Sequence, residues 1–128
     1  MNHYISLITN ALATLDEYAV VKQYDVLSHE HTATKFQLKL RIEFIDNTVL
    51  YTNEYIGGNR RKYAFQWQTA DDVWLVRWDN VPHFPKLASF PYHQHDYRSG
   101  SELVTESFDV VLVEVLVYID NLIAKPRK

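Results

Sequence analysis

The chain has 128 residues, of which 47% are hydrophobic and 23% are charged, so it has the size and composition of one globular domain. Its net charge of −3 argues against a protein that coats nucleic acid through overall charge. The lack of cysteine excludes disulfide scaffolds, thiol nucleophiles and thiolate metal sites. The N-terminus lacks a signal-peptide pattern, and no apolar run reaches the roughly 20 residues of a membrane span. We therefore expect a single cytoplasmic domain over residues 1–128, with no membrane segment.

The first part of the chain has the pattern of one helix followed by strands. Apolar residues at helical spacing indicate an amphipathic helix over residues 3–15. In the clearest strand, apolar and polar residues alternate strictly. Asp46-Asn47 and Gly57-Gly58-Asn59 have the residue types of tight turns. The pattern predicts a five-stranded antiparallel meander with strands at residues 19–29, 35–44, 48–56, 61–68 and 73–79.

Regular patterning stops near residue 79, and a loop over residues 79–101 follows. Three prolines stiffen this loop, and loops of this length inside a compact domain are usually functional. Ser101 or Thr105 then caps a predicted helix that extends to Ile123. Its apolar face would consist of Phe108, Val111, Leu112, Val115, Ile119 and Leu122. The sequence thus predicts an α+β fold: an N-terminal helix, a five-stranded antiparallel sheet, a His/Pro-rich loop and a C-terminal helix packed on the sheet.

Titratable side chains concentrate in and beside the loop, which holds three of the six histidines. The candidate catalytic residues are Arg77, Asp79, His83, His93 and His95. The candidate substrate-binding residues are Asn80, Lys86 and Arg98, together with Lys39 and Arg41 on the polar face of the strand at residues 35–44.

His93 and His95 form the sharpest pair. On an extended segment they project to one face, about 6.5–7 Å apart along the chain. Two imidazoles at this spacing can flank a phosphodiester, one taking a proton from a 2′-hydroxyl and the other giving one to the leaving oxygen. Arg77 or Lys86 would then neutralise charge that develops on the phosphate, and Asp79 would orient a histidine or an arginine. This chemistry requires neither a metal nor a thiol.

Other interpretations of the same residues stay open. His93 and His95 with His83 and Asp79 would also make a nitrogen/oxygen metal site, but no common ligand spacing is matched, so we expect no metal and no cofactor. Alternatively, the histidines and prolines only pack and cap a buried loop. The second His-x-His, at residues 29–31, is typical of a solvated turn. The basic run at residues 60–62 would touch phosphate or would simply discourage strand pairing at a wet edge.

A second apolar stripe marks the C-terminal helix. It consists of Val110, Val113 and Val117 and alternates with acidic residues. Such a stripe packs inside the domain or meets a partner protein. We take it as the candidate partner-binding surface, with the loop over residues 79–101 as the other surface that a partner would cover.

Two runs in and beside the loop carry a resemblance to a known family. They read RWDNVPHFP at residues 77–85 and FPYHQH at residues 90–95. These runs resemble the signature of the TumE-like family of small prokaryotic toxins, approximately R-[YW]-D-N-A-P-H-H-P followed by F-P-H-H-K-H. The preceding hairpin strands and the closing helix look similar too, so that the resemblance spans about residues 20–123. The chain departs from the pattern at Val81, Phe84, Tyr92 and Gln94, and Gln94 would weaken phosphate binding if the family's lysine provides it.

The resemblance implies a toxin of a toxin–antitoxin module, with a helix-turn-helix antitoxin as partner. Arg77, Asp79, Asn80, His83, His93 and His95 carry over by the motif match. Together with the residue chemistry, this predicts a metal-independent endoribonuclease that inhibits growth by hydrolytic or transesterifying cleavage of RNA. Two alternatives stay open: a toxin that acts by binding alone, and a toxin that transfers a group from a nucleotide to RNA or protein. A homo-oligomer also stays open.

Overall fold

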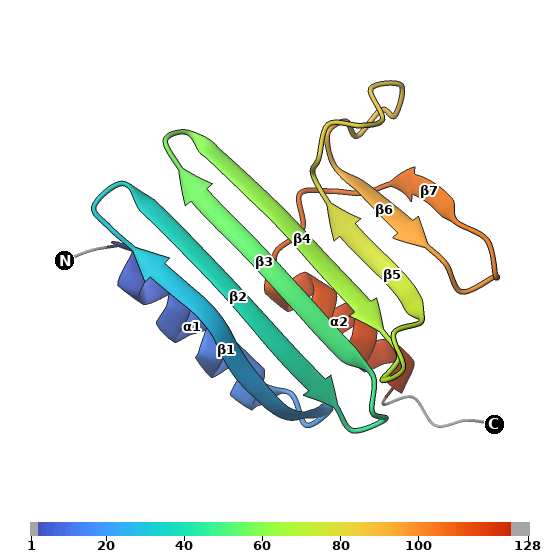
Figure 1. Cartoon of the computed structure of the whole chain (residues 1–128), viewed down its shortest axis with the longest axis horizontal. Coiled ribbons are helices and arrows are strands. Elements are labelled where there is room, and N and C mark those ends of the chain that lie inside the picture. Colours follow the sequence, from blue (N-terminus) through green and yellow to red (C-terminus); the bar gives the residue numbers. More distant parts are fainter. Residues whose placement is uncertain (1–2, 124–128) are drawn as a thin grey trace.

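The computed structural model describes residues 3–123, which form one sheet with two helices on one of its faces (Figure 1). The seven strands lie in sequence order, and all neighbouring strands are antiparallel. In chain order the elements are α1 (His3–Glu17), β1 (Val21–His31), β2 (Lys35–Phe44), β3 (Val49–Gly57), β4 (Arg60–Gln68), β5 (Trp74–Asp79), β6 (His93–Asp96), β7 (Leu103–Glu106) and α2 (Leu112–Ile123).

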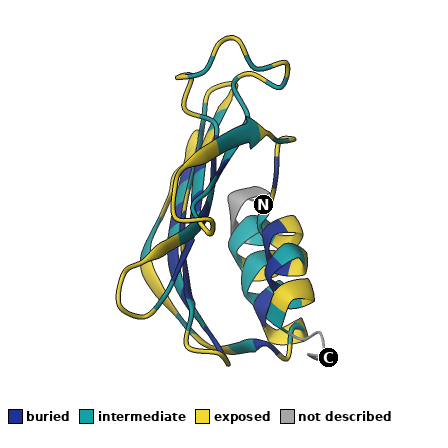
Figure 2. Cartoon of the chain, turned by 90° about the vertical axis from the view of Figure 1, so that its right-hand side faces the viewer, coloured by how far each residue is buried: buried dark blue, intermediate teal, exposed yellow. Residues whose placement is uncertain are grey.

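The alternating strands bury one face of the sheet against the helices. In β2 every second side chain, from Phe36 to Phe44, is buried, and the residues between them are partly exposed or exposed. Phe65 and Trp67 of β4 continue this core across the sheet. Both helices lie on that side, and the opposite sheet face is left uncovered (Figure 2). The fold therefore has two layers, with a polar sheet face open to solvent.

The hairpin turns have the expected chemistry. Asn47 has a positive φ of 69°, and Thr48 donates to the carboxylate of Asp46 through both its backbone N–H and its hydroxyl. Gly58 has a φ of 58°, where a glycine is least strained. The predicted N-terminal helix and the first five strands are confirmed, with ends that differ from the expected ones by at most two residues.

The expected five-stranded sheet is wrong in its count, because the sheet has seven strands. The predicted loop over residues 79–101 contains β6, which pairs with β5. The C-terminal helix does not begin at Ser101 or Thr105. Residues 103–106 form β7, paired with β6, and α2 starts at Leu112. The β-branched residues Val104 and Thr105 suit this strand.

This change also moves the apolar face of the helix. Val115, Leu116 and Ile119 are its buried residues, whereas Phe108 precedes the helix and is 85% exposed. Leu116 was not expected on the buried face. Neither helix within residues 3–123 has the length and apolarity required to cross a membrane.

Candidate functional site

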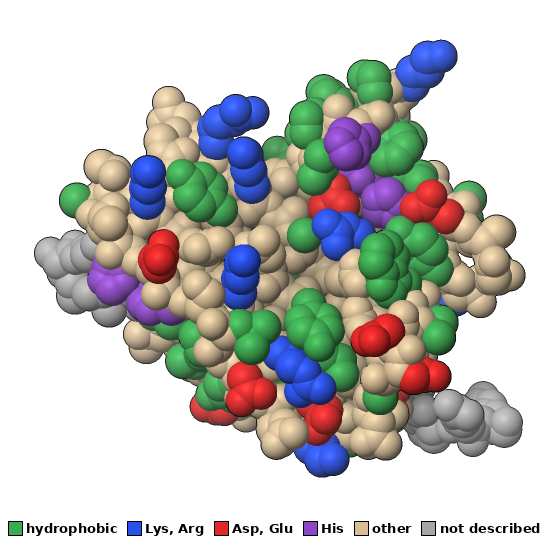
Figure 3. Space-filling view, in the orientation of Figure 1, with side chains coloured by type: hydrophobic (Ala, Val, Ile, Leu, Met, Phe, Trp, Pro, Cys, Tyr) green, Lys and Arg blue, Asp and Glu red, His purple; other side chains and the backbone are tan. Residues whose placement is uncertain are grey.

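The pairing of β5 with β6 builds the site. Asp79 lies opposite His93, and Arg77 lies opposite His95. Val76 and Trp78, which alternate with Arg77 and Asp79, are buried in the core. Because side chains alternate between the two faces of a strand, the four polar residues share the open face. In Figure 3, histidine, acidic and basic side chains accordingly gather over β5 and β6.

Asp79 is the hub of this cluster, and its side chain is only 4% exposed. One carboxylate oxygen, Oδ1, accepts from the backbone N–H of Val81 at 3.1 Å and lies 2.8 Å from His93 Nε2. The other, Oδ2, accepts from Arg77 Nε at 2.9 Å and lies 3.6 Å from His95 Nε2. A single buried carboxylate therefore meets one guanidinium and two imidazoles.

The outer nitrogen of each imidazole also has a partner. His93 Nδ1 lies 3.0 Å from the carbonyl oxygen of Pro91, and His95 Nδ1 lies 2.8 Å from Glu102 Oε2. The hydroxyl of Tyr97 donates to the same Glu102 oxygen at 2.9 Å. The pKa of Glu102 is lowered, first by the Tyr97 hydroxyl and then by His95. Both imidazoles are thus held at both nitrogens.

Aromatic packing fixes the two rings further. Their centroids are 4.8 Å apart. Phe84, from the loop, packs edge-on against both rings, at 4.9 Å from His93 and 5.8 Å from His95. On the other side, Tyr97 stacks parallel to His95 at 6.0 Å. Such packing holds the imidazoles in defined rotamers, as a reaction centre or a metal centre requires.

The side chains of the cluster differ in how far they are exposed to solvent. The side chain of His93 is 2% exposed, that of His95 is 11% exposed, and that of Arg77 is 30% exposed. Arg77 also donates through Nη1 to Gln66 on β4, at 2.9 Å. A molecule on the open face would therefore meet Arg77 and the edge of His95 first, with Asp79 and His93 beneath them.

Asp79, His93 and His95 are the group that could hold a metal ion among the residues that the structure describes. Each offers one ligand atom, and these atoms all lie within 4.8 Å of one another. His83 belongs to the sequence-based candidates but not to this group. It is exposed and contacts the ring of Phe84 at 6.5 Å. With Lys86 and Val104 it lines a separate cavity of about 400 Å³.

The candidate substrate-binding residues are spread over both faces. Asn80 turns back to β4, where its side chain accepts from Tyr63 N and donates to Arg61 O. Arg98 is bound to Asp96 and to the Tyr118 hydroxyl of α2. Both therefore have structural contacts outside the cluster.

Lys39 and Arg41 keep the expected position on the open face of β2. Lys39 and Arg77 line the same shallow pocket of about 300 Å³ across β2 to β5. Arg41 lies 3.9 Å from Glu43, and a hydrogen bond with Tyr51 raises its pKa. Glu102, Tyr97 and Phe84 were missed. Only the pairing of β6 with β7 brings Glu102 beside His95, and the sequence held no signal for that pairing.

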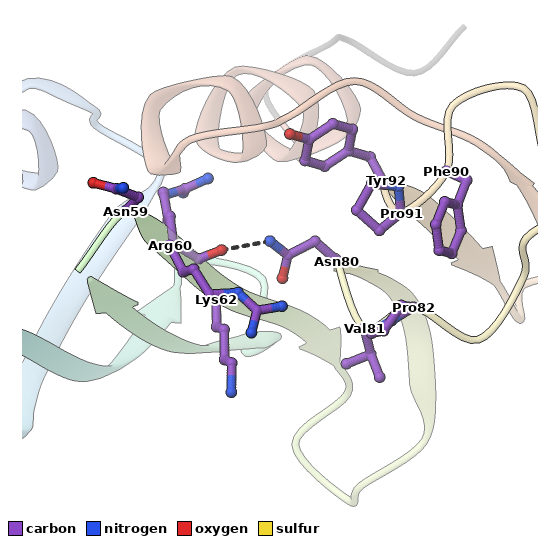
Figure 4. Close-up of a pocket in the computed structure, with 10 residues that line it drawn as sticks. Asn59, Arg60, Lys62, Asn80, Val81, Pro82, Phe90, Pro91 and Tyr92 are labelled. Atoms are coloured by element: carbon purple, nitrogen blue, oxygen red, sulfur yellow. Dashed lines mark hydrogen bonds between the residues drawn. The ribbon is translucent and has the colours of Figure 1, made fainter. Parts of the chain in front are cut away.

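A larger cavity, of about 590 Å³, lies at the end of β4 beside the loop (Figure 4). Arg60 and Lys62 of β4 lie on one side of it, and Phe90 and Tyr92 lie on the other. The cavity thus combines cationic and aromatic side chains. It borders the cluster through Asn80 and Pro91, next to Asp79 and two residues before His93.

The candidate partner surface is divided by the fold. Val110 is 9% exposed and belongs to the core, and its carbonyl accepts from Arg61. Val113 and Val117 are both about 40% exposed on α2. Phe108 and Val111, which precede the helix, are also exposed, at 85% and 42%.

The fold and the site together define a small α+β protein whose open sheet face carries a buried carboxylate–imidazole–guanidinium cluster. The family model of toxin TumE matches residues 11–123 of the chain, and the chain belongs to that family. The matched range holds every residue of the cluster, and the resemblance drawn from the two sequence runs is confirmed. Comparisons with curated proteins and with solved structures found no match. As a member of a toxin family, the protein has a toxin role, and the family implies an antitoxin partner.

Proposed function

We propose that this toxin is an endoribonuclease of the cytoplasm whose reaction centre is the cluster of Asp79, His93, His95 and Arg77. The observation that carries the proposal is the convergence of two imidazoles and one guanidinium within 3.6 Å of one carboxylate on the open sheet face. Imidazole transfers protons near neutral pH, and a guanidinium stabilises charge on a phosphate. RNA, which carries its own 2′-hydroxyl nucleophile, suits such a centre.

The surroundings of the cluster suit a single-stranded RNA. Arg60 and Lys62 provide cations for phosphates in the neighbouring cavity, and Phe90 and Tyr92 provide aromatic surfaces for bases. On the other side, Lys39 shares a pocket with Arg77. An RNA strand that crosses the open face between these pockets would pass over His95 and Arg77.

In the metal-independent form of this proposal, His95 is the proton-transfer group. It accepts the proton of the 2′-hydroxyl while the 2′-oxygen attacks phosphorus, and Arg77 stabilises the charge on the phosphate oxygens. The bond to the 5′-oxygen breaks, giving a 2′,3′-cyclic phosphate and a 5′-hydroxyl that takes up a proton. His93, at 2% exposure, is too buried for the direct role that the sequence suggested, whereas His95 is 11% exposed and its Nε2 lies farther from Asp79, at 3.6 Å. We assign His93 the positioning of Asp79.

An RNA cleavage assay with the purified protein tests the proposal. We expect the wild type to cleave RNA. The cleavage rates of His95→Ala and Arg77→Ala should fall by about tenfold to a hundredfold or more. His29→Ala is the matched control, because it removes a partly exposed imidazole of the other His-x-His, on β1 at the far edge of the sheet. Intact RNA with a wild type that still arrests growth rules out the endoribonuclease.

We propose further that a helix-turn-helix antitoxin covers the exposed apolar surface of α2. Val113 and Val117 present apolar side chains there, and Phe108, which precedes the helix, is 85% exposed. Exposed apolar surface of this kind is typical of protein interfaces. Co-purification of the antitoxin with the wild type and with Val113→Asp tests this surface. A complex that the substitution leaves unchanged excludes it.

A further inference from the structure

We infer that Asp79, His93 and His95 bind one divalent transition-metal ion. The ligand atoms are the Nε2 atoms of both imidazoles and one carboxylate oxygen of Asp79. This inference rests on the reaction centre of the proposed function and deepens it, since it gives His95 the role of a ligand in place of proton transfer.

The first argument is the convergence of the ligand atoms. The Nε2 atom of His93 lies 2.8 Å from Asp79 Oδ1, and that of His95 lies 3.6 Å from Asp79 Oδ2. With metal–ligand bonds of about 2.0–2.1 Å in a tetrahedral site, neighbouring ligand atoms are about 3.3 Å apart. The two observed distances are measured to different oxygens of Asp79, so only one of them joins two ligand atoms, and each lies within about 0.5 Å of this value. All three ligand atoms lie within 4.8 Å of one another, so that small side-chain rotations complete the site.

The second argument is the outer partner of each imidazole. A carbonyl oxygen, that of Pro91, faces His93 Nδ1, and a carboxylate oxygen of Glu102 faces His95 Nδ1. Both oxygens only accept hydrogen bonds, so each Nδ1–H donates to its outer partner. Histidines that bind metal donate their other N–H to this kind of acceptor. In both rings the other nitrogen, Nε2, is the one that faces Asp79, where a metal ion would take the place of a proton between imidazole and carboxylate.

The third argument is that the site is rigid beneath and open above. Phe84 and Tyr97 hold the rings by packing, and the backbone N–H of Val81 holds Asp79. Three protein ligands leave the remaining coordination positions to water or to a phosphate oxygen. Arg77, the most exposed member of the cluster, stands beside those positions. Two imidazoles and one carboxylate suit Zn²⁺, Mn²⁺, Fe²⁺, Co²⁺ or Ni²⁺ better than Mg²⁺, which prefers oxygen ligands.

The chain offers its own control for adventitious binding. His29 and His31 form a second His-x-His on β1, with 3.2 Å between His31 Nδ1 and His29 Nε2. Both are exposed, or nearly so, at an edge of the sheet. In this pair one imidazole nitrogen faces the other imidazole, whereas in the inferred site the imidazole nitrogens face a carboxylate. Surface imidazoles of this kind bind metal weakly, and substituting them removes that background.

Calorimetric titration of the chelator-stripped full-length protein with Zn²⁺ tests the inference. We expect the double variant His29→Ala/His31→Ala to bind one Zn²⁺ per chain with a dissociation constant in the micromolar range or tighter. His95→Ala in the same background should lose at least a hundredfold in affinity. Glu102→Gln, which changes no ligand, should lose tenfold to a hundredfold, because the carboxylate orients His95. Circular dichroism checks that each variant is folded.

Two outcomes overturn the inference: the double variant binds no Zn²⁺, or folded His95→Ala binds as tightly as its parent. The RNA assay, run in chelator and then with Zn²⁺ or Mn²⁺ restored, separates this result from the proposed function. Cleavage by a protein that binds no metal overturns the inference and leaves the metal-independent endoribonuclease in place. A single tight Zn²⁺ at the cluster, with no RNA cleavage under either condition, supports the metal site and overturns the endoribonuclease.

Discussion

At the scale of single residues, Asp79 decides how the site is organised. Its carboxylate is almost fully buried, and yet it accepts from the N–H of Val81 and from Arg77 and faces both imidazoles. A buried carboxylate without such partners is strongly destabilising, whereas these donors compensate its desolvation. The same contacts hold the imidazoles in place, so that stability and the geometry of the site depend on one side chain.

Replacing this side chain should therefore destabilise the fold. For Asp79→Ala we expect a loss of about 3 kcal/mol in the free energy of unfolding, because the N–H of Val81 and the buried imidazole of His93 lose their acceptor. Urea denaturation measures the change. Asp25→Ala, on an exposed position of β1, is the matched control and should stay within about 0.5 kcal/mol. A change below about 1 kcal/mol for Asp79→Ala would contradict this role.

The carboxyl group of Glu102 makes one contact of the site depend on pH. The Tyr97 hydroxyl, followed by His95, lowers the pKa of its carboxyl. A lowered folded-state pKa means that the stabilising contact is fully present above the unfolded-state pKa and is lost as the pH falls through the folded-state value. Burial and Glu102 in turn raise the pKa of Tyr97 to about 12. The Glu102–Tyr97 contact should thus persist below the pH at which an ordinary glutamate titrates.

The substitution Tyr97→Phe tests this coupling. Without the hydroxyl donor, the pKa of Glu102 should rise toward its ordinary value, and the contact should be lost at a higher pH. NMR titration of the side-chain carboxyl carbons, with Glu102→Gln to assign the signal, follows the shift. An unchanged Glu102 titration in Tyr97→Phe would show that the hydroxyl does not hold the carboxylate.

At the scale of elements, the sequence predicts the hairpins of the first five strands but does not predict the last two strands of the sheet. Strict alternation in β2 and tight-turn residues such as Asp46-Asn47 specify the pairing of the first strands. The four residues of β6, HQHD, also alternate in burial, but their buried members are His93 and His95. No apolar pattern marks such a strand. In the sequence, nothing separates Val104 and Thr105 of β7 from the valine-rich helix that follows. The predicted helix therefore begins too early.

The site shows the same limit. That His93 and His95 share one face follows from extended geometry, and the structure agrees. Their meeting with Asp79 depends on the register of β5 against β6, and the contact of Glu102 depends on β7. These are long-range pairings with no local signal. His83 was selected with the other histidines by proximity in sequence alone, and it lies outside the cluster.

The two faces of α2 give a prediction at this scale. Leu116 is fully buried under the sheet, whereas Val113 is 41% exposed. Leu116→Asp should destabilise the protein by more than about 4 kcal/mol, because it buries an unpaired charge and removes core packing. Val113→Asp should change stability by less than about 1 kcal/mol. Thermal unfolding followed by circular dichroism compares them, and equal losses would contradict the assigned faces.

At the scale of the whole molecule, the main feature is that the two faces of the sheet have different roles. Both helices cover one face and complete the core, so that the other face is free to carry the polar cluster and its pockets (Figures 2 and 3). The two His-x-His pairs lie on opposite edge regions of the same sheet. His93 and His95 face a buried carboxylate, whereas His29 and His31 lie near the solvent.

This contrast decides how toxicity should respond to substitution. On induction in a host without antitoxin, we expect the wild type to arrest growth. His95→Ala and Arg77→Ala should restore growth, because each removes a group of the cluster that faces the open side. His29→Ala should still arrest growth, since it removes the same side-chain type from a pair with no carboxylate hub. Growth curves and immunoblots, with the soluble fraction compared, measure the effect at equal levels of folded protein.

The comparison distinguishes a working site from a packing role of the loop. If the cluster only packs, variants that stay folded at wild-type levels keep their toxicity, and His95→Ala arrests growth as the wild type does. If the cluster is the working site, toxicity is lost at unchanged levels of soluble protein, and His29→Ala remains toxic. Rescue by His29→Ala as well would place the toxic surface elsewhere on the sheet. Among the cluster variants, Arg77→Ala is the most informative. Arg77 is partly exposed, so its loss disturbs the core less than the loss of the other cluster residues, and it removes the cation nearest to solvent.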